Sequence, residues 1–378
     1  MMRETRMMSD LPQDLIEEIL YRVPVASLRR LRATCKRWYH QALFKDPRFI
    51  KQYYDKTARQ YHALMLVEFR VCPMSTVLDR LRRNIIVSLD GHRLISPHCN
   101  EAVDLSKAFH CDGILVCPFK KNMIVVWNPF SGQTRWIQLQ NKHYIGAYAL
   151  GYDKNKLCRS YKILRFECIY EKLAPDSVEI YEFTSNSWRN LDAIIPDQAY
   201  LKSDGHACAS LSGNTYWVSW IKKGDNDDYS LLSFDFSTER FQRLCAPFHH
   251  QPCRVDTMAL SVVREEHLSL FYQSRQTLKV EIWMTDEIHT TFVSWSKFLT
   301  LDLVSPSFSN SMSFYIVDEE KKVVVCCVED GFFDSKLVWI VREGEEYIPD
   351  LPVYYGRQSV GFRSICHMPK LFGYVPKN

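Results

Sequence analysis

Hydrophobic and polar positions follow two patterns along this chain, and the change falls near residue 60. In residues 9–44 the apolar side chains recur every three or four positions, which predicts amphipathic helices. Pro12 suits the first turn of the first helix, and Pro24 ends it. The stripe of the first helix is Ile16, Ile19, Leu20 and Val23. The stripe of the next, which Ser27 can cap, is Leu28, Leu31, Cys35 and Trp38. Short helices in a segment of about 40 residues cannot close a core alone, so this apolar surface needs a partner in this chain or another.

From about residue 61 onward, short apolar runs rich in β-branched and aromatic residues replace the helical pattern, and turn residues separate them. The predicted strands are Ala63–Phe69, Ile114–Cys117, Ile124–Trp127, Tyr161–Phe166, Val178–Phe183, Thr215–Trp220, Leu231–Phe236, Leu268–Tyr272, Val280–Met284, Ser313–Val317, Val323–Val328 and Leu337–Val341. The fold class is therefore mainly β with a small N-terminal α module.

A repeat runs through the strand region. Phe130, Phe183 and Phe236 are 53 residues apart each time, and each belongs to a strand-then-turn segment that an aromatic residue follows. A period near 50 residues with four short strands per unit is typical of a kelch-like β-propeller, in which blades bury their faces against one another. Strands at 61–95 and the run Arg363–Tyr374 would complete a sixth blade from both ends of the domain. The alternative fold is a pair of β-sandwiches.

Composition and charge narrow the function classes. Apolar residues make up 46% and charged residues 24%, which excludes a mostly disordered chain. The net charge of +4 is uneven, because residues 1–60 hold 13 Lys and Arg against 7 Asp and Glu while the rest is nearly neutral. A basic head on a near-neutral body does not indicate nucleic-acid binding. The 13 cysteines form no CxxC pair, and the chain shows neither a signal peptide nor a membrane-length apolar run. We expect no membrane association and a reducing compartment, the nucleus or the cytoplasm.

Candidate catalytic chemistry is weak throughout the sequence. Cys35 lies beside Lys36 and Arg37, cations that can lower a thiol pKa, but its place on the apolar stripe favours burial. The run His249-His250-x-x-Cys253 is half of a metal site without a second ligand pair at conventional spacing. No phosphate-binding loop, nucleophile elbow or dinucleotide fingerprint is present. We therefore expect no enzyme activity, no metal and no cofactor.

The N-terminal module resembles an F-box. The resemblance is carried by Leu11-Pro12-x-Asp14-Leu15, Ile19-Leu20-x-Arg22-Val23-Pro24-Val25-x-Ser27-Leu28, Arg30-Leu31-Arg32-Ala33-Thr34-Cys35-Lys36-Arg37-Trp38 and Asp46-Pro47-x-Phe49. Polar, proline, cysteine and tryptophan positions match together over about 40 residues, which makes the resemblance specific.

The remainder is similar to the plant F-box-associated interaction domain of type 1, which is kelch-like. The matching segments include His110-Cys111-Asp112-Gly113-Ile114-Leu115, Val126-Trp127-Asn128-Pro129-Phe130, Ala149-Leu150-Gly151-Tyr152-Asp153, Leu231-Leu232-x-Phe234-Asp235-Phe236 and Val293-Ser294-Trp295-Ser296-Lys297-Phe298. With this resemblance the chain divides into a disordered N-terminus (1–8), an F-box (9–50), a linker (51–60) and the associated domain with a propeller of about six blades (61–378).

The resemblance implies a non-catalytic, substrate-recognition subunit of an SCF-type E3 ubiquitin ligase. The F-box would dock on a Skp-family adaptor, which links it to a cullin and a RING protein, and the propeller would hold an unknown protein substrate. The expected adaptor-docking set is Leu11, Pro12, Leu15, Ile19, Leu20, Pro24, Leu28, Leu31 and Trp38. Two alternatives stay open: several of these residues only pack the module's own core, or the protein tethers a protein or glycan partner without ubiquitination.

Substrate capture is expected from loops at one end of the propeller. If each unit runs through four strands, the loops between second and third strands share a face. These loops are Phe119–Asn122, Glu171–Asp176, Lys222–Tyr229, Gln273–Thr277 and Glu329–Ser335. The candidate contact residues within them are Lys121, Lys223, Arg275, Phe332 and Phe333. Their mixed charges do not name a substrate, and a solvated hairpin tip or burial within a blade are the competing interpretations.

Overall fold

The structure is a computed structural model of the 378-residue chain. It describes residues 12–21, 63–67, 70–73, 92–96, 108–119, 122–128, 133–139, 146–156, 159–169, 171–174, 177–192, 194–196, 199–202, 208–223, 226–248, 252–253, 256–264, 266–302, 312–318, 322–330, 335–342 and 363–367. The second predicted helix, with Leu28, Leu31, Cys35 and Trp38, lies outside these residues.

The first predicted helix is present as α1, Gln13–Tyr21. Its first turn carries Asp14, whose negative charge suits a helix N-terminus, and the Ile16 amide donates to the Pro12 carbonyl at 3.1 Å. Ile16 and Leu20, one turn apart, are both fully buried. The apolar stripe therefore faces protein, as its spacing predicts.

All twelve predicted strands have counterparts, and every strand pair is antiparallel. The bounds in chain order are β1 Ala63–Val67, β2 Arg70–Pro73, β3 His92–Arg93, β4 Phe109–Cys111, β5 Ile114–Phe119, β6 Met123–Asn128, β7 Gln133–Gln138, β8 Gly146–Asp153, β9 Ser160–Ile169, β10 Lys172–Leu173, β11 Glu179–Glu182, β12 Ser187–Asn190, β13 Tyr200–Leu201, β14 Cys208–Leu211, β15 Asn214–Lys223, β16 Asn226–Asp235, β17 Arg240–Cys245, β18 Thr257–Val263, β19 His267–Gln273, β20 Lys279–Ile288, β21 Val293–Asp302, β22 Met312–Asp318, β23 Val323–Asp330, β24 Ser335–Arg342 and β25 Arg363–His367.

Consecutive strands form small up-and-down sheets. The orders are β4-β5-β6-β7, β18-β19-β20-β21 and β22-β23-β24, while β8, β9, β11 and β12 form one unit and β14 to β17 the next. Strand β25 pairs with β1 in a sheet that continues to β2 and β3. The two ends of the domain thus share a sheet, as the sequence predicts.

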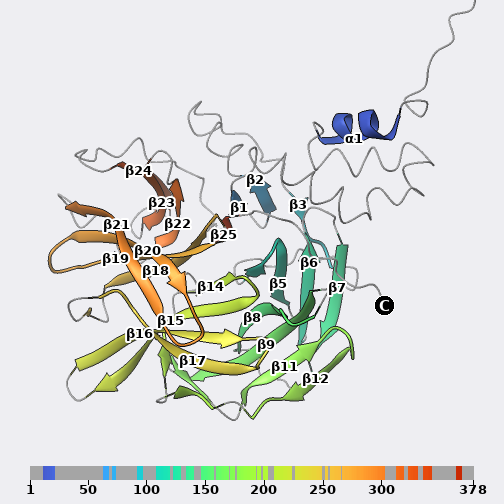
Figure 1. Ribbon diagram of the computed structural model, residues 1–378, viewed down its shortest axis with the longest axis horizontal. Helices are drawn as coiled ribbons and strands as arrows, with labels where there is room; N and C mark the ends of the chain where they lie inside the picture. The colour runs from blue at the N-terminus through green and yellow to red at the C-terminus, as the bar shows by residue number, and fades with distance from the viewer. Residues whose placement is uncertain are drawn as a thin grey trace, which may run out of the picture.

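The first strands of these units surround a common centre. Contacts run from β4 to β8, β14, β18, β22 and β25 in turn, and from β25 back to β4. Figure 1 shows the sheets fanning outward from this centre, with β12, β17 and β21 toward the outside. A ring of this kind is the arrangement of a propeller and differs from the stacked sheet pairs of the alternative fold, the β-sandwiches.

Apolar side chains between neighbouring units form the core. One cluster joins the β4–β7 and β8–β12 units around Val126, Leu150 and Ile163. A second joins the β8–β12 and β14–β17 units around Leu164, Phe166 and Phe234. Alternate residues of β9 therefore enter different clusters, because successive side chains of a strand point to opposite faces. The β8–β12 unit is therefore buried on both faces.

One pair of units is also joined through the backbone. The short strand β10 pairs with both β9 and β13, and β13 pairs with β15, so the β8–β12 and β14–β17 units become one continuous sheet. The Leu201 amide donates to the Glu171 carbonyl at 2.8 Å within this bridge. The sequence gives no signal for such two-residue strands.

Candidate functional site

The adaptor-docking set is described only in part. Pro12 is exposed, Leu15 is 48% exposed and Ile19 is half-buried, whereas Leu20 is fully buried within this chain. Leu11, Pro24, Leu28, Leu31 and Trp38 lie outside the described residues. Pro12, just before α1, and Leu15 on α1 thus present apolar surface to solvent. The burial of Leu20 fits the alternative interpretation, in which a residue of the set packs the module's own core.

The loops predicted to share a face do connect second and third strands. Lys223 ends β15 at the tip of the β15–β16 hairpin, and Arg275 lies in the turn between β19 and β20. Both side chains are exposed. Lys121, Phe332 and Phe333 fall in the corresponding connections of other units, but outside the described residues.

A buried carboxylate that the sequence analysis missed organises the Arg275 turn. Asp256, 3% exposed, accepts hydrogen bonds from the Cys253 amide (2.7 Å), the Tyr272 hydroxyl (2.9 Å) and the Arg275 amide (3.0 Å). Burial and the neighbouring Asp256 raise the pKa of Tyr272, so its hydroxyl remains a donor. The Lys202 ammonium donates to the Asp256 carbonyl at 2.8 Å, which adds a contact from the neighbouring unit. The turn is therefore held from several sides.

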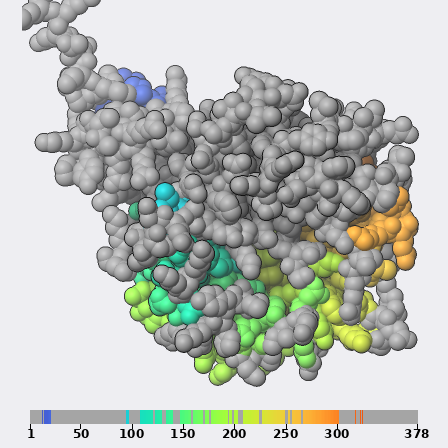
Figure 2. All heavy atoms as spheres, turned by 180° about the vertical axis from the view of Figure 1, so that it is seen from behind, coloured from blue at the N-terminus to red at the C-terminus, as the bar shows by residue number. Residues whose placement is uncertain are grey.

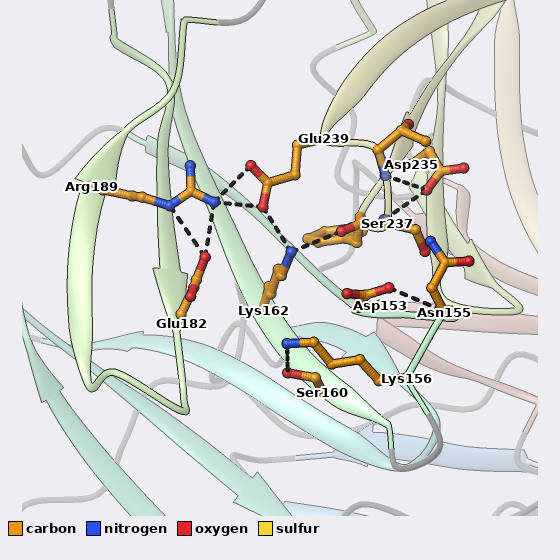
Figure 3. Close-up of polar contacts among 12 residues, drawn as sticks. Asp153, Asn155, Lys156, Ser160, Lys162, Glu182, Arg189, Asp235, Ser237 and Glu239 are labelled. Carbon is orange, nitrogen blue, oxygen red and sulfur yellow. Dashed lines mark hydrogen bonds and ion pairs between the residues drawn. The ribbon is translucent and has the colours of Figure 1, made fainter.

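A polar cluster joins the β8–β12 and β14–β17 units (Figure 3). It lies at the end of the strands opposite to the β15–β16 hairpin tip. Glu239, in the turn between β16 and β17, accepts from Arg189 on β12 at 2.5 and 2.6 Å and from Lys162 on β9 at 2.7 Å. Lys162 is 7% exposed and also donates to the Phe236 carbonyl at 3.1 Å. Burial acts to raise the pKa of Glu239, but Arg189 and Lys162 outweigh it and hold the pKa below its ordinary value.

The contact between an arginine and a turn residue of the next unit is also found one unit earlier. Arg135 on β7 donates to the Asn186 side chain at 2.7 Å in the turn between β11 and β12. Arg135 and Arg189 are 54 residues apart, and Asn186 and Glu239 are 53 apart with φ of 54° and 56°. The fourth strands β7 and β12 thus each present an arginine to the last turn residue of the next unit. The phenylalanine repeat pointed to these turns but not to the arginines.

A third contact between units lies at the turn between β4 and β5. Arg159 donates to the Asp112 carboxylate at 2.5 Å and lies 4.8 Å from the Tyr152 ring centroid. His110, before this turn, accepts from the Gly113 amide at Nε2, and burial lowers its pKa to about 4. The Arg159–Asp112 pair therefore connects two units, and His110 caps the turn between β4 and β5.

The described residues were also searched for metal sites and membrane spans. Among them, no group of three or more His, Cys, Asp or Glu side chains is placed to hold a metal ion. None of their helices has the length and apolarity to span a membrane. His249 and His250 lie outside the described part of the chain.

Two domain families match this sequence. The F-box domain matches residues 8–48, and the F-box associated beta propeller domain matches residues 62–377. An N-terminal helix followed by antiparallel sheets around a common centre agrees with both. The chain therefore belongs to the family of F-box proteins with an associated beta-propeller domain.

The sequence is similar to plant proteins over nearly the whole of this chain. "Putative F-box protein At3g17560" of Arabidopsis thaliana is 48% identical over 99% of this chain and 98% of its own. "F-box/kelch-repeat protein At3g44120" of the same plant is 39% identical over 97% of this chain and 95% of its own. Among solved structures, apo AztD from Citrobacter koseri shares 9% identity over 70% of this chain and 75% of that chain, and its TM-score of 0.35 is too low to bear on the fold.

Proposed function

We propose that this protein is a non-catalytic substrate receptor of an SCF-type E3 ubiquitin ligase. The observation that carries the proposal is the order of its two domains: an F-box at residues 8–48, the class of domain that generally binds a Skp-family adaptor, ahead of a propeller at residues 62–377. The adaptor would link the chain to a cullin and a RING protein, and the propeller would hold a protein substrate.

The geometry of α1 supports the docking half of this proposal. Leu15, with nearly half of its surface exposed, lies one residue before the fully buried Ile16. An exposed leucine on an amphipathic helix is the kind of anchor that fits an apolar groove on a partner. Figure 2 shows the α1 atoms and the green atoms of residues 150–200 at opposite ends of the view.

The number of blades and the location in the cell are part of the same proposal. The contacts from β4 to β25 and back favour six blades, with the β25–β1 pair closing the sixth. We place the protein in the nucleus or the cytoplasm, where its cysteines stay reduced.

The proposal is tested by isolating the full chain from plant cells and assaying for the cullin and RING subunits. We expect both to co-purify with the wild-type chain and to be lost with Leu15→Asp. A receptor also requires that proteins bound to its propeller accumulate when the chain is removed. Unchanged abundance of such proteins would favour the non-proteolytic alternative, and absence of the cullin from the wild-type sample would contradict the proposal.

A further inference from the structure

Two neighbouring units present unpaired cations at the same end of the propeller. Within the described residues, the ammonium groups of Lys222 and Lys223 and the guanidinium of Arg275 make no hydrogen bond or ion pair, and all three side chains are exposed. Lys222 and Lys223 end β15, and Arg275 lies in the β19–β20 turn. Both positions connect second and third strands, so they share a face.

The acidic groups that the structure describes beside these cations already have partners. Asp228, on the strand that returns from the hairpin tip, pairs with Arg243 at 3.0 Å, and its neighbour Asp227 also has a partner. Asp256 is buried under three hydrogen bonds. The exposed acids of β20, Asp286 and Glu287, lie at the other end of that strand from Lys279 and the Arg275 turn. Asp225, in the same hairpin tip, lies outside the described residues; among those that the structure describes at the two tips, the unpaired charge is positive.

An aromatic contact through the partly buried Phe248 joins the two units near these tips. Phe248 lies with its ring centroid 6.3 Å from Tyr229, near the tip of the β15–β16 hairpin, and 5.2 Å from Tyr272. The Tyr272 hydroxyl holds Asp256, and Asp256 in turn accepts from the Arg275 amide. Trp220, opposite Tyr229 in the ladder, stacks on Tyr200 with centroids 4.2 Å apart. Packing thus holds the hairpin at the Trp220–Tyr229 pair, and hydrogen bonds to Asp256 hold the Arg275 turn.

The Arg275 turn is also ordered by its own hydrogen bonds. The Ser274 amide donates to the Lys279 carbonyl at 2.9 Å, and the Thr277 amide donates to the Ser274 hydroxyl at 3.3 Å. A backbone that is fixed before binding lowers the entropy lost when the side chain contacts a partner. The turn is therefore suited to recognition.

We propose that Arg275 and Lys223 form the core of a surface that binds an acidic segment of the protein substrate. This inference rests on the proposed function, because it names the chemistry of the segment that the receptor recognises. A guanidinium and an ammonium with no internal partner match carboxylate groups, and phosphate groups carry the same kind of charge. The surface spans the β14–β17 and β18–β21 units and leaves α1 free for the adaptor.

The test passes a degenerate library of short peptides over the immobilised full chain and sequences the peptides retained. We expect enrichment of Asp and Glu for the wild-type chain, and loss of that enrichment for the double variant Arg275→Glu, Lys223→Glu. The matched control is Arg240→Glu, which reverses an exposed arginine at the opposite end of the β14–β17 unit. A parallel library with phosphoserine at one position distinguishes carboxylate from phosphate recognition.

For a retained acidic peptide, the double variant should weaken binding by about tenfold or more, as charge reversal at an interface typically does. Equal enrichment in the double variant and the control, enrichment of peptides without acidic residues, or preferred retention of an RNA oligonucleotide would overturn the proposal. Binding of the Skp-family adaptor is measured on the same proteins. If the adaptor fails to bind but acidic peptides are retained, the ligase role fails and the recognition surface stands.

Discussion

Arg189 and Glu239 connect two neighbouring units of the propeller domain, since the arginine's Nη2 donates to both carboxylate oxygens of the glutamate. The same carboxylate receives the buried ammonium of Lys162. One unit earlier, Arg135 meets Asn186 in the equivalent turn, so the contact between units is repeated with a neutral acceptor. Neighbouring units are thus joined by polar contacts at the turns as well as by their apolar cores.

Removing the Glu239 carboxylate should destabilise the domain. In Glu239→Ala, Lys162 keeps only the Phe236 carbonyl as an acceptor, and we expect the free energy of unfolding to fall by about 1–3 kcal/mol. The measurement is urea denaturation followed by tryptophan fluorescence. Glu182→Ala is the control, because Glu182 also pairs with Arg189 but lies nearer the surface, where such pairs contribute about 0.2–1 kcal/mol. Equal losses in both variants would argue against a special role for the Lys162 contact.

Gly151 should not tolerate a side chain. A Cβ at this position would overlap the Phe236 ring and the Gly213 carbonyl oxygen, and the latter is backbone that cannot rotate away. Gly213 has φ +82°, and a Cβ there would lie 2.8 Å from the Tyr152 ring. We expect Gly151→Ala to lower the free energy of unfolding by about 1–3 kcal/mol or more in the same assay. A free energy of unfolding equal to that of the wild type would show that β8 and the turns with Gly213 and Phe236 do not approach this closely.

The twelve apolar strands and the pairing of the chain ends could be predicted because burial on both faces leaves a continuous apolar run. The outer strand β12 could not, since only Trp188 among its residues is apolar and its other side chains face solvent. β18 was missed for another reason: its sequence, TMALSVV, contains Met, Ala and Leu, which suit helices equally well.

The site was harder to predict than the fold. Arg275 and Lys223 were found because hairpin tips follow from strand positions. Asp256 and Arg189 were not, because Tyr272 and Glu239 lie 16 and 50 residues away from them in sequence and come into contact with them only on folding. The whole adaptor-docking set stays a prediction.

His110 should make stability depend on pH. It is neutral in the folded chain with a pKa of about 4, whereas its ordinary value is 6.5. Between these values the unfolded chain binds more protons than the folded chain, so the free energy of unfolding should fall as the pH drops from about 6.5 toward 4. Urea denaturation at about pH 7 and pH 5 should show a smaller fall for His110→Gln than for the wild type. The exposed His289→Gln serves as the control, and an identical fall in all three chains would contradict the assignment.

Leu15 and Ile16 should separate adaptor docking from folding. Leu15→Ala removes exposed apolar surface, so we expect weaker adaptor binding, by about 1–4 kcal/mol for a buried interface anchor, with an unchanged melting temperature. Ile16→Ala removes a fully buried side chain and should lower the stability of the helical module. Calorimetry of adaptor binding together with thermal denaturation checks both. Unchanged affinity in Leu15→Ala, or an equal loss of stability in the two variants, would remove Leu15 from the docking set.

The central claim is that the N-terminal module ties this propeller to a Skp-family adaptor. The most direct measurement is a pull-down of the full chain and of residues 61–378 with the purified adaptor. The account predicts that the full chain binds and that deletion of residues 1–60 abolishes binding. Failure of the full chain to bind would contradict the account, and the propeller alone would then have to explain the protein.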